Sequence, residues 1–302
     1  MERSLGVGRP QSSMPKFLIV TADDFGLHPA VNDAVDHAYR EGILTAASLM
    51  VGAPAAADAV RRAHALPRLR VGLHLVLADG LATLAPGLIP ALADGAGYMD
   101  GDMFTRGIRY FALPSVRRQL DAEIHAQFAA FARTGLTLDH VNVHKHFHLH
   151  PSVLALLLRI GSEYGVSAVR VPDEPLWFAA ASAGIGAGVS SVLIQPWVSL
   201  MKHRLRRAGM FYNDQVFGIA ASGAMNEERL LKIIARLPAG VTEIYLHPAA
   251  GAGAIANSMA DYRHADELAA LVSPRVREAV AAARVERGGF RDFARGAGIR
   301  AA

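Results

Sequence analysis

The chain has 302 residues, 52% of them hydrophobic, which is enough to build one large α/β domain, and no linker-like run or internal repeat divides it. Because it contains no cysteine, disulfides, a thiolate nucleophile and a thiolate zinc site are excluded, so histidines and carboxylates are the only candidate metal ligands. The formal net charge of +4 suits an acidic substrate or an anionic membrane, but without a nucleic-acid-binding motif it is too small to indicate a nucleic-acid partner.

The two ends of the chain differ in composition from the rest. Residues 1–14 lack the apolar core of a signal peptide, so we expect a flexible N-terminal extension and a cytoplasmic protein. A single domain over residues 15–290 and a flexible C-terminal tail over residues 291–302 complete the expected organisation.

The first half of the chain alternates between apolar strand patterns and amphipathic helix patterns. Residues 17–20 are apolar and β-branched, as in a short buried strand, and residues 28–42 follow with apolar positions at helical spacing. The same order recurs, and it predicts strands over 48–54, 69–77 and 137–144, helices over 55–66 and 114–133, and a long loop from 78 to about 107.

The stretch HVNVHKHFHLHP, residues 140–151, holds five of the thirteen histidines. If it continues as one extended strand, its side chains alternate between two faces, and one face would carry His140, Asn142, His144, His146, His148 and His150. Those positions would span roughly 33 Å. At most two or three of them could therefore serve one site.

The second half of the chain predicts two further strands, over residues 166–172 and 241–248, each after a helical pattern. Repeated strand–helix units of this length require a parallel sheet with right-handed crossovers. The predicted fold class is therefore α/β, with the sheet either closed as a (β/α) barrel or open and doubly wound.

Polar residues stand at or near the carboxyl ends of these apolar strands: Asp23, Asp24, His74, His144, Arg170 and His247. In barrels and open α/β sheets alike, that edge is where active sites are assembled. Taken singly, each residue also has an ordinary explanation, such as a helix cap, a core histidine, a turn or a salt bridge. Their shared position favours a common site.

Adjacent aspartates such as Asp23 and Asp24 point to opposite faces of a strand, so one can bind a metal while the other acts as a base. One aspartate with two histidines leaves open coordination positions on Zn²⁺, Mn²⁺ or Fe²⁺, as a catalytic site requires. A divalent ion there would acidify a water molecule and polarise a carbonyl oxygen. The predicted reaction class is hydrolysis of an amide or ester.

Residues 176–201 carry no charge and run into the basic sequence KHRLRR at 202–207. Their length would allow a bilayer span, but Gln195, Pro196 and several small residues weaken that interpretation. The alternatives are peripheral membrane contact through an interfacial helix in 176–207, and a buried connection or lid.

A set of motifs resembles a known family. The sequence contains, in the order and approximate spacing of the YdjC-like (ChbG-type) carbohydrate deacetylases, the motifs TADDFG, VGLHLVL, DHVNVHKHFHLHP, VRVP and EIYLHPAAG. They cover about residues 15–290, and the chain looks most similar to the subgroup associated with hopanoid biosynthesis (HpnK-like). The resemblance implies a single (β/α) barrel, incomplete or distorted, with its active site at the carboxyl ends of the strands.

The resemblance also implies an enzyme that removes the acetyl group from an N-acetylated sugar, here an N-acetylglucosaminyl hopanoid or a similar glycolipid. It would use one divalent ion, Zn²⁺ or Mg²⁺ first, with Mn²⁺, Co²⁺ or Fe²⁺ as alternatives. Carried over by motif, the metal ligands would be Asp24, His74 and His144. A metal-bound water, deprotonated by Asp23, would attack the amide carbonyl, and His247 would protonate the departing amine.

Other motif residues take supporting roles. Arg170 matches an arginine of the family and could orient the base through a charge-assisted pair. Many relatives read Asp-Ser-His-x-His where this chain has Asn142 first, and an amide cannot act as a base, so it can only orient a neighbour. His146 would reach the substrate, while His148 and His150 would cap or pack the following turn. The remaining histidines are expected to be structural: His28, His37, His64, His125, His203 and His264.

Three other functions fit parts of the same pattern. A deacetylase of soluble chito-oligosaccharides would need no apolar segment. Two histidines and a carboxylate also form the site of Fe²⁺ oxygenases, although those enzymes usually sit on antiparallel double-sheet scaffolds. A non-catalytic peripheral lipid-binding protein would explain 176–207 but not a base beside the metal. A homodimer and a peripheral location at the inner membrane are left open.

Overall fold

The computed structural model describes residues 15–183, 185–251, 255 and 261–296. The extension expected at 1–14 lies outside these residues, as do residues 297–302 of the expected tail. The strands are β1 (Lys16–Phe25), β2 (Ala46–Leu49), β3 (Arg70–Leu75), β4 (Gly80–Leu81), β5 (Tyr98–Met99), β6 (Val141–Val143), β7 (Gln215–Phe217), β8 (Gly240–Leu246) and β9 (Glu286–Arg287).

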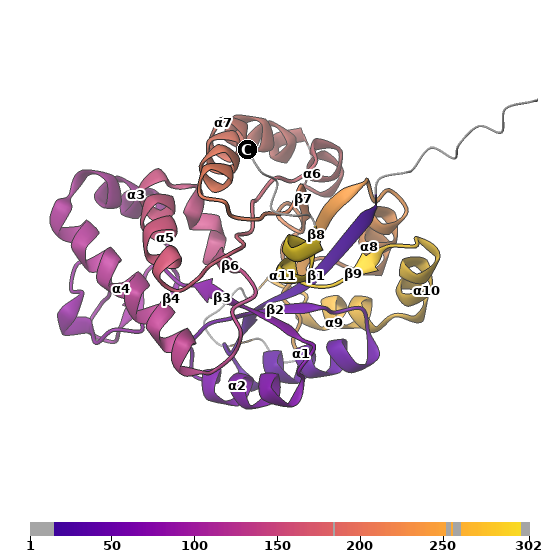
Figure 1. Cartoon of the computed structure of the whole chain (residues 1–302), viewed down its shortest axis with the longest axis horizontal. Coiled ribbons are helices and arrows are strands. Elements are labelled where there is room, and N and C mark those ends of the chain that lie inside the picture. Colours follow the sequence, from indigo (N-terminus) through magenta and orange to yellow (C-terminus); the bar gives the residue numbers. More distant parts are fainter. Residues whose placement is uncertain (1–14, 184, 252–254, 256–260, 297–302) are drawn as a thin grey trace, which may run out of the picture.

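The helices surround these strands (Figure 1). They are α1 (Pro29–Glu41), α2 (Ala56–Ala65), η1 (Pro86–Leu88), α3 (Met103–Ala112), α4 (Pro114–Arg133), η2 (His144–Leu149), α5 (Pro151–Glu163), α6 (Leu176–Ala183), α7 (Ile185–Arg207), α8 (Glu227–Ile234), α9 (His264–Val272), α10 (Pro274–Ala282) and α11 (Phe290–Gly296).

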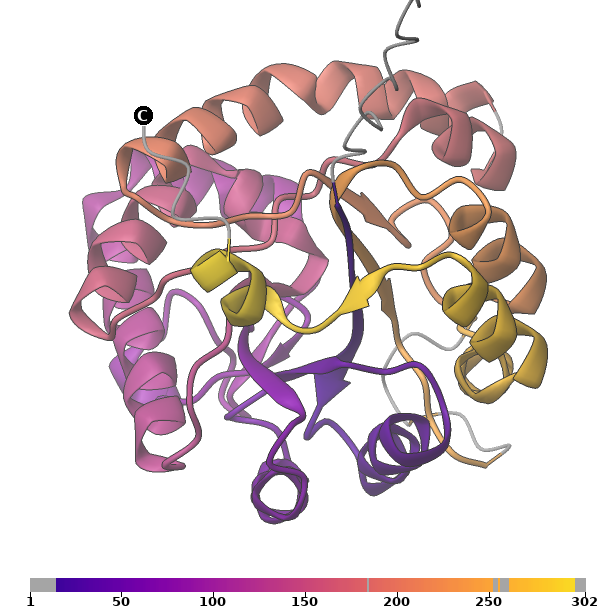
Figure 2. The same cartoon turned by 45° about the vertical axis from the view of Figure 1, so that its right-hand side comes forward.

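One curled sheet forms the centre of the molecule (Figure 2). Its strand order is β6-β3-β2-β1-β8-β7, with β9 paired to the start of β1, and all of these pairs are parallel. In β1, residues 18–25 are buried without interruption, as expected of a strand that is covered on both faces. The predicted α/β class and the distorted (β/α) barrel are confirmed.

The gap between β6 and β7 is filled by residues 168–171, which we call the seam. Val169 forms a single bridge to Val141 of β6, and Ala168 forms another to Phe211, upstream of β7. The strand predicted over 166–172 is thus replaced by an irregular segment that connects the two edges of the sheet. Arg170 lies in the middle of it.

The histidine stretch does not continue as one extended strand, and only the end of the strand predicted over 137–144 is regular. β6 ends at Val143, and η2 follows with Lys145 (φ 54°, ψ 24°) and His146 (φ 55°, ψ 29°) in the left-handed region. Two consecutive residues in that region turn the chain, so the alternation of faces stops there. His150 then caps α5, its Nδ1 accepting from the N–H of Ser152 at 3.3 Å, which fits its predicted capping role.

The long loop predicted after β3 contains short elements. β4 and β5 form an antiparallel pair, and α3 begins before the predicted end of the loop. We call residues 76–113, between β3 and α4, the first excursion. Glu123 of α4 holds it in place, because its buried carboxylate accepts hydrogen bonds from the N–H groups of Thr83 and Leu84 at 2.7 and 3.0 Å. The helix predicted over 114–133 is confirmed as α4.

Residues 176–183 form α6 and residues 185–207 form α7, with Pro196 inside α7. The inner side of α7 buries Val198, Met201 and Leu205, and Lys202 pairs with Asp173 just after the seam. Among the helices of the described residues, none combines the length and the apolar character that crossing a bilayer requires.

The first part of the expected C-terminal tail is helix α11. Phe290 and Phe293 of this helix are buried against the start of β1 and its neighbours. The side chain of Asp139 accepts the first two N–H groups of the helix, at 3.0 Å each.

Candidate active site

The two aspartates of β1 lie at a bulge near the end of the strand. The register with β2 shifts there, and Asp24 has a φ of 61°. A regular strand would send Asp23 and Asp24 to opposite faces, as the sequence predicts, whereas at this bulge both buried carboxylates lie on the side of His74. Asp24 lies 3.3 Å from Nε2 of His74, and Asp23 is linked to the same ring through Asn142.

Asp24, His74 and His144 form a buried group whose ligand atoms lie within 4.8 Å of one another. Nδ1 of His144 lies 3.5 Å from Oδ1 of Asp24 and 3.3 Å from Nε2 of His74. Neither carboxylate oxygen of Asp24 has a hydrogen-bond partner in the described structure. A buried, unsatisfied carboxylate facing two imidazole nitrogens fits a divalent cation with further coordination positions open.

The charge state of Asp24 suits a metal ligand. Burial raises the pKa of its carboxyl group, but the imidazoles of His144 and His74 outweigh this effect, and the pKa lies well below its usual range. Burial lowers the pKa of His74, but the charges of Asp23 and Asp24 raise it overall. A metal ion would therefore compete with a proton for Nε2 of His74.

Asn142 fixes the orientation of His74. Its Oδ1 lies 2.7 Å from Nδ1 of His74, and because an amide oxygen only accepts, Nδ1 donates and Nε2 is the nitrogen available toward Asp24. The Nδ2 group of Asn142 donates to Oδ1 of Asp23 at 3.0 Å and to Oγ of Ser48 at 2.9 Å. One amide therefore joins the candidate metal-binding group to the second aspartate.

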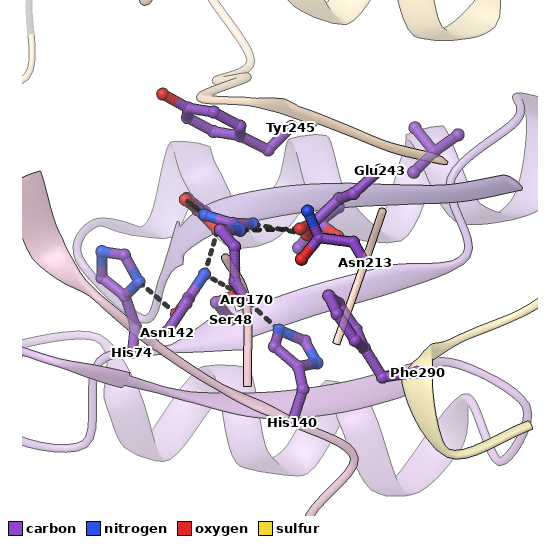
Figure 3. Close-up of polar contacts among 12 residues, drawn as sticks. Ser48, His74, His140, Asn142, Arg170, Asn213, Glu243, Tyr245 and Phe290 are labelled. Carbon is purple, nitrogen blue, oxygen red and sulfur yellow. Dashed lines mark hydrogen bonds and ion pairs between the residues drawn. The ribbon is translucent and has the colours of Figure 1, made fainter. Parts of the chain in front are cut away.

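A polar chain continues from this amide to the C-terminal helix (Figure 3). Oγ of Ser48 lies 3.1 Å from Nε2 of His140, and Nδ1 of His140 lies 2.9 Å from Asp139, which caps α11. The His140 ring stacks on Phe290 at 4.7 Å. Gly72 of β3 leaves room for this ring, because a Cβ there would lie 2.5 Å from it. His140 thus supports the site from behind.

Arg170 is fully buried between two carboxylates, below the ring of Tyr245 (Figure 3). It donates to Asp23 through Nη1 and Nη2 at 2.5 and 3.0 Å, and to Glu243 through Nε and Nη2 at 2.9 and 2.7 Å. The ring of Tyr245 covers the guanidinium carbon at 4.5 Å. Burial raises the pKa of Asp23, but Arg170 outweighs this, so the pKa lies far below its usual range. Asp23 is held ionised and in a fixed orientation.

His247, at the end of β8, has its backbone held on both sides. Its N–H donates to Glu267 at 2.5 Å, and its carbonyl accepts from Nδ1 of His264 at 2.5 Å. Its ring packs against Tyr262 at 5.1 Å, and its Nδ1 has no hydrogen-bond partner in the part of the chain that the structure describes. Burial lowers the pKa of His247 more than the nearby aspartates raise it, so the imidazole is neutral at neutral pH.

The last two histidines of η2 have separate roles. Nε2 of His146 lies 3.1 Å from the hydroxyl of Tyr245. Nε2 of His148 donates to the carbonyl of Arg170 at 2.8 Å. Burial lowers the pKa of both rings, that of His148 to about 4, so both are neutral. His146 faces the cavity of the site, whereas His148 supports the seam.

Two cavities share His144 as a wall. The smaller has a volume of about 190 Å³ and is lined by Asp23, His74, Val143, His144, Lys145, His146, Ile219, Ser222, Tyr245, His247 and Tyr262. The larger, of about 660 Å³, lies between α1, α2 and the excursion after β3. Most of its lining is apolar, including Leu27, Met50, Val76, Leu81 and Ile255. Its volume is typical of small-molecule sites.

The structure brings together all of the site residues named from the sequence: Asp23, Asp24, His74, Asn142, His144, His146, Arg170 and His247. Sequence reasoning missed Ser48, Glu243, Tyr245, Tyr262 and Glu267, and it assigned His264 a structural role without a place at the site. Glu243 did give a signal, because an acid inside an apolar strand pattern needs a buried partner.

We expect His144→Ala to weaken zinc binding strongly, because it removes one of the three candidate ligands and leaves β1 and β3 intact. The affinity should fall by more than the roughly 10–100-fold that losing an outer hydrogen-bond partner of a metal ligand costs. Isothermal titration calorimetry of zinc into metal-stripped protein measures this loss.

His150→Ala is the matched control, because His150 lies in the same segment and caps α5 instead of facing the cavity. This variant should bind zinc as the wild type does. Equal zinc affinity of the wild type and His144→Ala would contradict the ligand assignment.

Comparisons with known proteins agree with this geometry. Residues 17–282 match the family described as YdjC-like protein. The chain is 32% identical over 238 residues to a carbohydrate deacetylase of Geobacillus stearothermophilus, a match that covers 78% of this chain and 80% of that protein. It is 39% identical over 155 residues to a carbohydrate deacetylase of Brevibacillus brevis, covering 51% of this chain and 59% of that protein, which is less than two thirds of its length.

Among solved structures, a protein of Enterococcus faecalis V583 superimposes with a TM-score of 0.71 at 22% identity. The alignment covers 92% of this chain and 99% of that one, and it supports the fold alone. The family match, by contrast, extends over most of the sequence, from β1 to the end of α10. The chain therefore belongs to the YdjC-like family.

Proposed function

We propose that the protein is a metal-dependent carbohydrate deacetylase that hydrolyses the acetyl amide of an N-acetylated sugar. The observation that carries this proposal is one small cavity lined by two histidines of the candidate cation-binding group, His74 and His144, together with Asp23 and His247. The relatives named carbohydrate deacetylases support the reaction class. An Fe²⁺ oxygenase is disfavoured, because the sheet is parallel and the chain matches the YdjC-like family.

Asp24, His74 and His144 would hold one divalent ion. When bound, such an ion polarises the acetyl carbonyl and lowers the pKa of a water molecule. Two imidazole nitrogens with one carboxylate favour Zn²⁺ over Mg²⁺, which prefers oxygen ligands in octahedral geometry. Mn²⁺, Co²⁺ and Fe²⁺ are further candidates for the same set of ligands.

Asp23 is the proposed base. It would accept a proton from the water whose oxygen attacks the acetyl carbon, and Arg170 keeps its carboxylate ionised and oriented for that transfer. A carboxylate with so low a pKa is a weak base. The transfer therefore depends on a water molecule that is itself unusually acidic.

His247 is the proposed acid. The carbon–nitrogen bond breaks as the amine nitrogen takes a proton from the imidazole, and acetate and the free amino sugar are released. Because burial keeps His247 neutral at neutral pH, it must first receive the proton that Asp23 took from the water. His146 and Tyr262, which line the same cavity, are placed to contact the sugar.

We further propose that the substrate is an N-acetylglucosaminyl hopanoid or a similar glycolipid. The larger cavity begins at His144 and is mostly apolar, so it suits an apolar aglycone, whose burial is favourable by about 25 cal/mol per Å². A soluble chito-oligosaccharide, the alternative substrate, would leave those apolar walls in contact with water.

A glycolipid substrate requires access to a bilayer, and we propose peripheral contact through residues 176–207 at the cytoplasmic side of the inner membrane. The exposed rings of Trp177 and Trp197 favour the membrane interface, and the arginines at the end of α7, Arg204, Arg206 and Arg207, favour anionic headgroups. A lipid-binding protein without catalysis would not need the ion pair that orients Asp23.

Acetate release from a panel of N-acetylglucosamine conjugates tests the substrate. The zinc-loaded protein should act on an N-acetylglucosaminyl hopanoid in mixed micelles with kcat/KM at least about tenfold above that for a chito-oligosaccharide, which corresponds to about 1.4 kcal/mol. The non-acetylated glucosaminyl hopanoid is the blank. A preference for the soluble sugar would refute the glycolipid proposal, and no acetate from any conjugate would refute deacetylation itself.

Asp23→Asn should lower kcat by about 10²–10⁴-fold, because a general base typically contributes that much. Zinc affinity should stay near that of the wild type, since Asp23 is not one of the three proposed ligands. Initial rates of acetate release and zinc titration measure the two effects. Asp33→Asn, the same change on α1 away from both cavities, is the control. Turnover by Asp23→Asn close to the wild-type rate would remove Asp23 from the mechanism.

A further inference from the structure

Within the described residues, the exposed large apolar side chains are confined to two excursions of the chain. The first follows β3 and carries Leu81, Leu88, Phe104, Ile108, Phe111 and Leu113. The second follows the seam and carries Leu176, Trp177, Val192, Leu193, Trp197 and Leu200. Where several of them stand on one face of a single helix, they mark a candidate interaction surface.

Helix α3 has one buried face and one solvent-exposed face. On its inner face, the hydroxyl of Tyr110 donates to the carbonyl of Leu77 at 2.9 Å, and its ring packs against Phe147 of η2. On its outer face, Phe104 and Phe111 are 79% and 68% exposed, and with Ile108 they stand at i, i+4 and i+7. That spacing places them on one stripe of the helix, which nothing in the described structure covers.

The charges around this stripe are basic. No acid occurs between Met103 and Leu120. Arg117 and Arg118, at the start of α4, are exposed and form no ion pair among the described residues. The two acidic side chains just before α3 already have partners within the chain, because Asp100 pairs with Arg106 and Asp102 caps the helix.

Helix α7 carries the same combination of side chains. Leu193, Trp197 and Leu200 are exposed and continue at helical spacing into Arg204 and Arg207. Both α3 and α7 adjoin η2, the segment that carries His144. Figure 1 shows α3 and α7 along the upper rim of the molecule. The two helices that carry the stripes therefore flank one segment of the candidate active site.

We propose that the outer face of α3 docks on an anionic lipid bilayer, with Phe104, Ile108 and Phe111 in the headgroup region and Arg117 and Arg118 on the phosphates. Exposed aromatic side chains beside unpaired arginines are the pattern of interfacial membrane helices. The inference rests in part on the proposed function, because it extends the contact proposed for 176–207 to a separate element. Docking itself requires no chemistry at the metal-binding group.

A second copy of the chain is a weaker candidate for this face. In a symmetric dimer, the same patch lies on both subunits, so Arg117 and Arg118 would face like charges. An anionic surface instead satisfies both the apolar and the basic part of the stripe.

Co-sedimentation with vesicles of phosphatidylcholine, with or without phosphatidylglycerol, tests the proposal on the full chain. The double variant Phe104→Ser, Phe111→Ser should bind phosphatidylglycerol vesicles at least about tenfold more weakly than the wild type, because two large side chains no longer enter the interface. Arg117→Glu with Arg118→Glu should lose mainly the part of binding that depends on phosphatidylglycerol and falls with added salt.

Leu88→Ser is the matched control, since Leu88 is 66% exposed but lies outside α3, and it should bind as the wild type does. Unchanged release of acetate from a soluble conjugate shows that the double variant is folded and separates this test from that of the reaction. Wild-type binding by the double variant, or no vesicle binding by the wild type, would overturn the proposal. The proposal would also be overturned if light scattering showed that the wild type is a dimer and the double variant is a monomer.

Discussion

The buried ion pairs of Arg170 are the interaction on which the rest of the site depends. Its guanidinium joins the seam to Asp23 on β1 and to Glu243 on β8 at the place where the sheet has no regular strand. Removing one partner of such a group costs about 3–5 kcal/mol, because it leaves a buried charge uncompensated. Since the pKa of Asp23 is lower in the folded state, its contribution to stability is fully present above the ordinary value of 3.8 and is lost as the pH falls below it.

The same ion pairs separate the roles of two neighbouring carboxylates. Asp23 accepts three hydrogen bonds, from Asn142 and Arg170, whereas both oxygens of Asp24 lack a hydrogen-bond partner in the described structure and face imidazole nitrogens. Asn142 fits between them because it presents an acceptor to His74 and a donor to Asp23. A carboxylate at position 142 could accept from His74, but it would face the oxygen of Asp23 without a proton to donate. The amide is therefore compatible with an ionised Asp23 in a way that a second anion is not.

The fold class and the main site residues could be predicted because both depend on strand ends. Parallel strands end at one edge, so Asp24, His74 and His144 had to approach one another. The path of the histidine stretch could not be predicted, because a left-handed turn at two non-glycine residues has no signature in an apolar alternation. Nor could the partners of Arg170, since Glu243 lies far along the chain and only the pairing of β1 with β8 brings it near. Helix α3 was not predicted from the sequence, because its apolar stripe faces outward and does not mark a side that packs on the core.

The segment η2 adjoins the candidate site, the apolar cavity and the helices α3 and α7. It therefore connects the proposed chemistry with the proposed approach of a lipid. The proposed chemistry requires the cation to lie beside Asp23. Anomalous diffraction at the zinc edge, from crystals soaked in zinc, locates the ion without reference to activity. We predict one strong peak between the side chains of Asp24, His74 and His144. A peak at other histidines, or none there at saturating zinc, would contradict the proposed site.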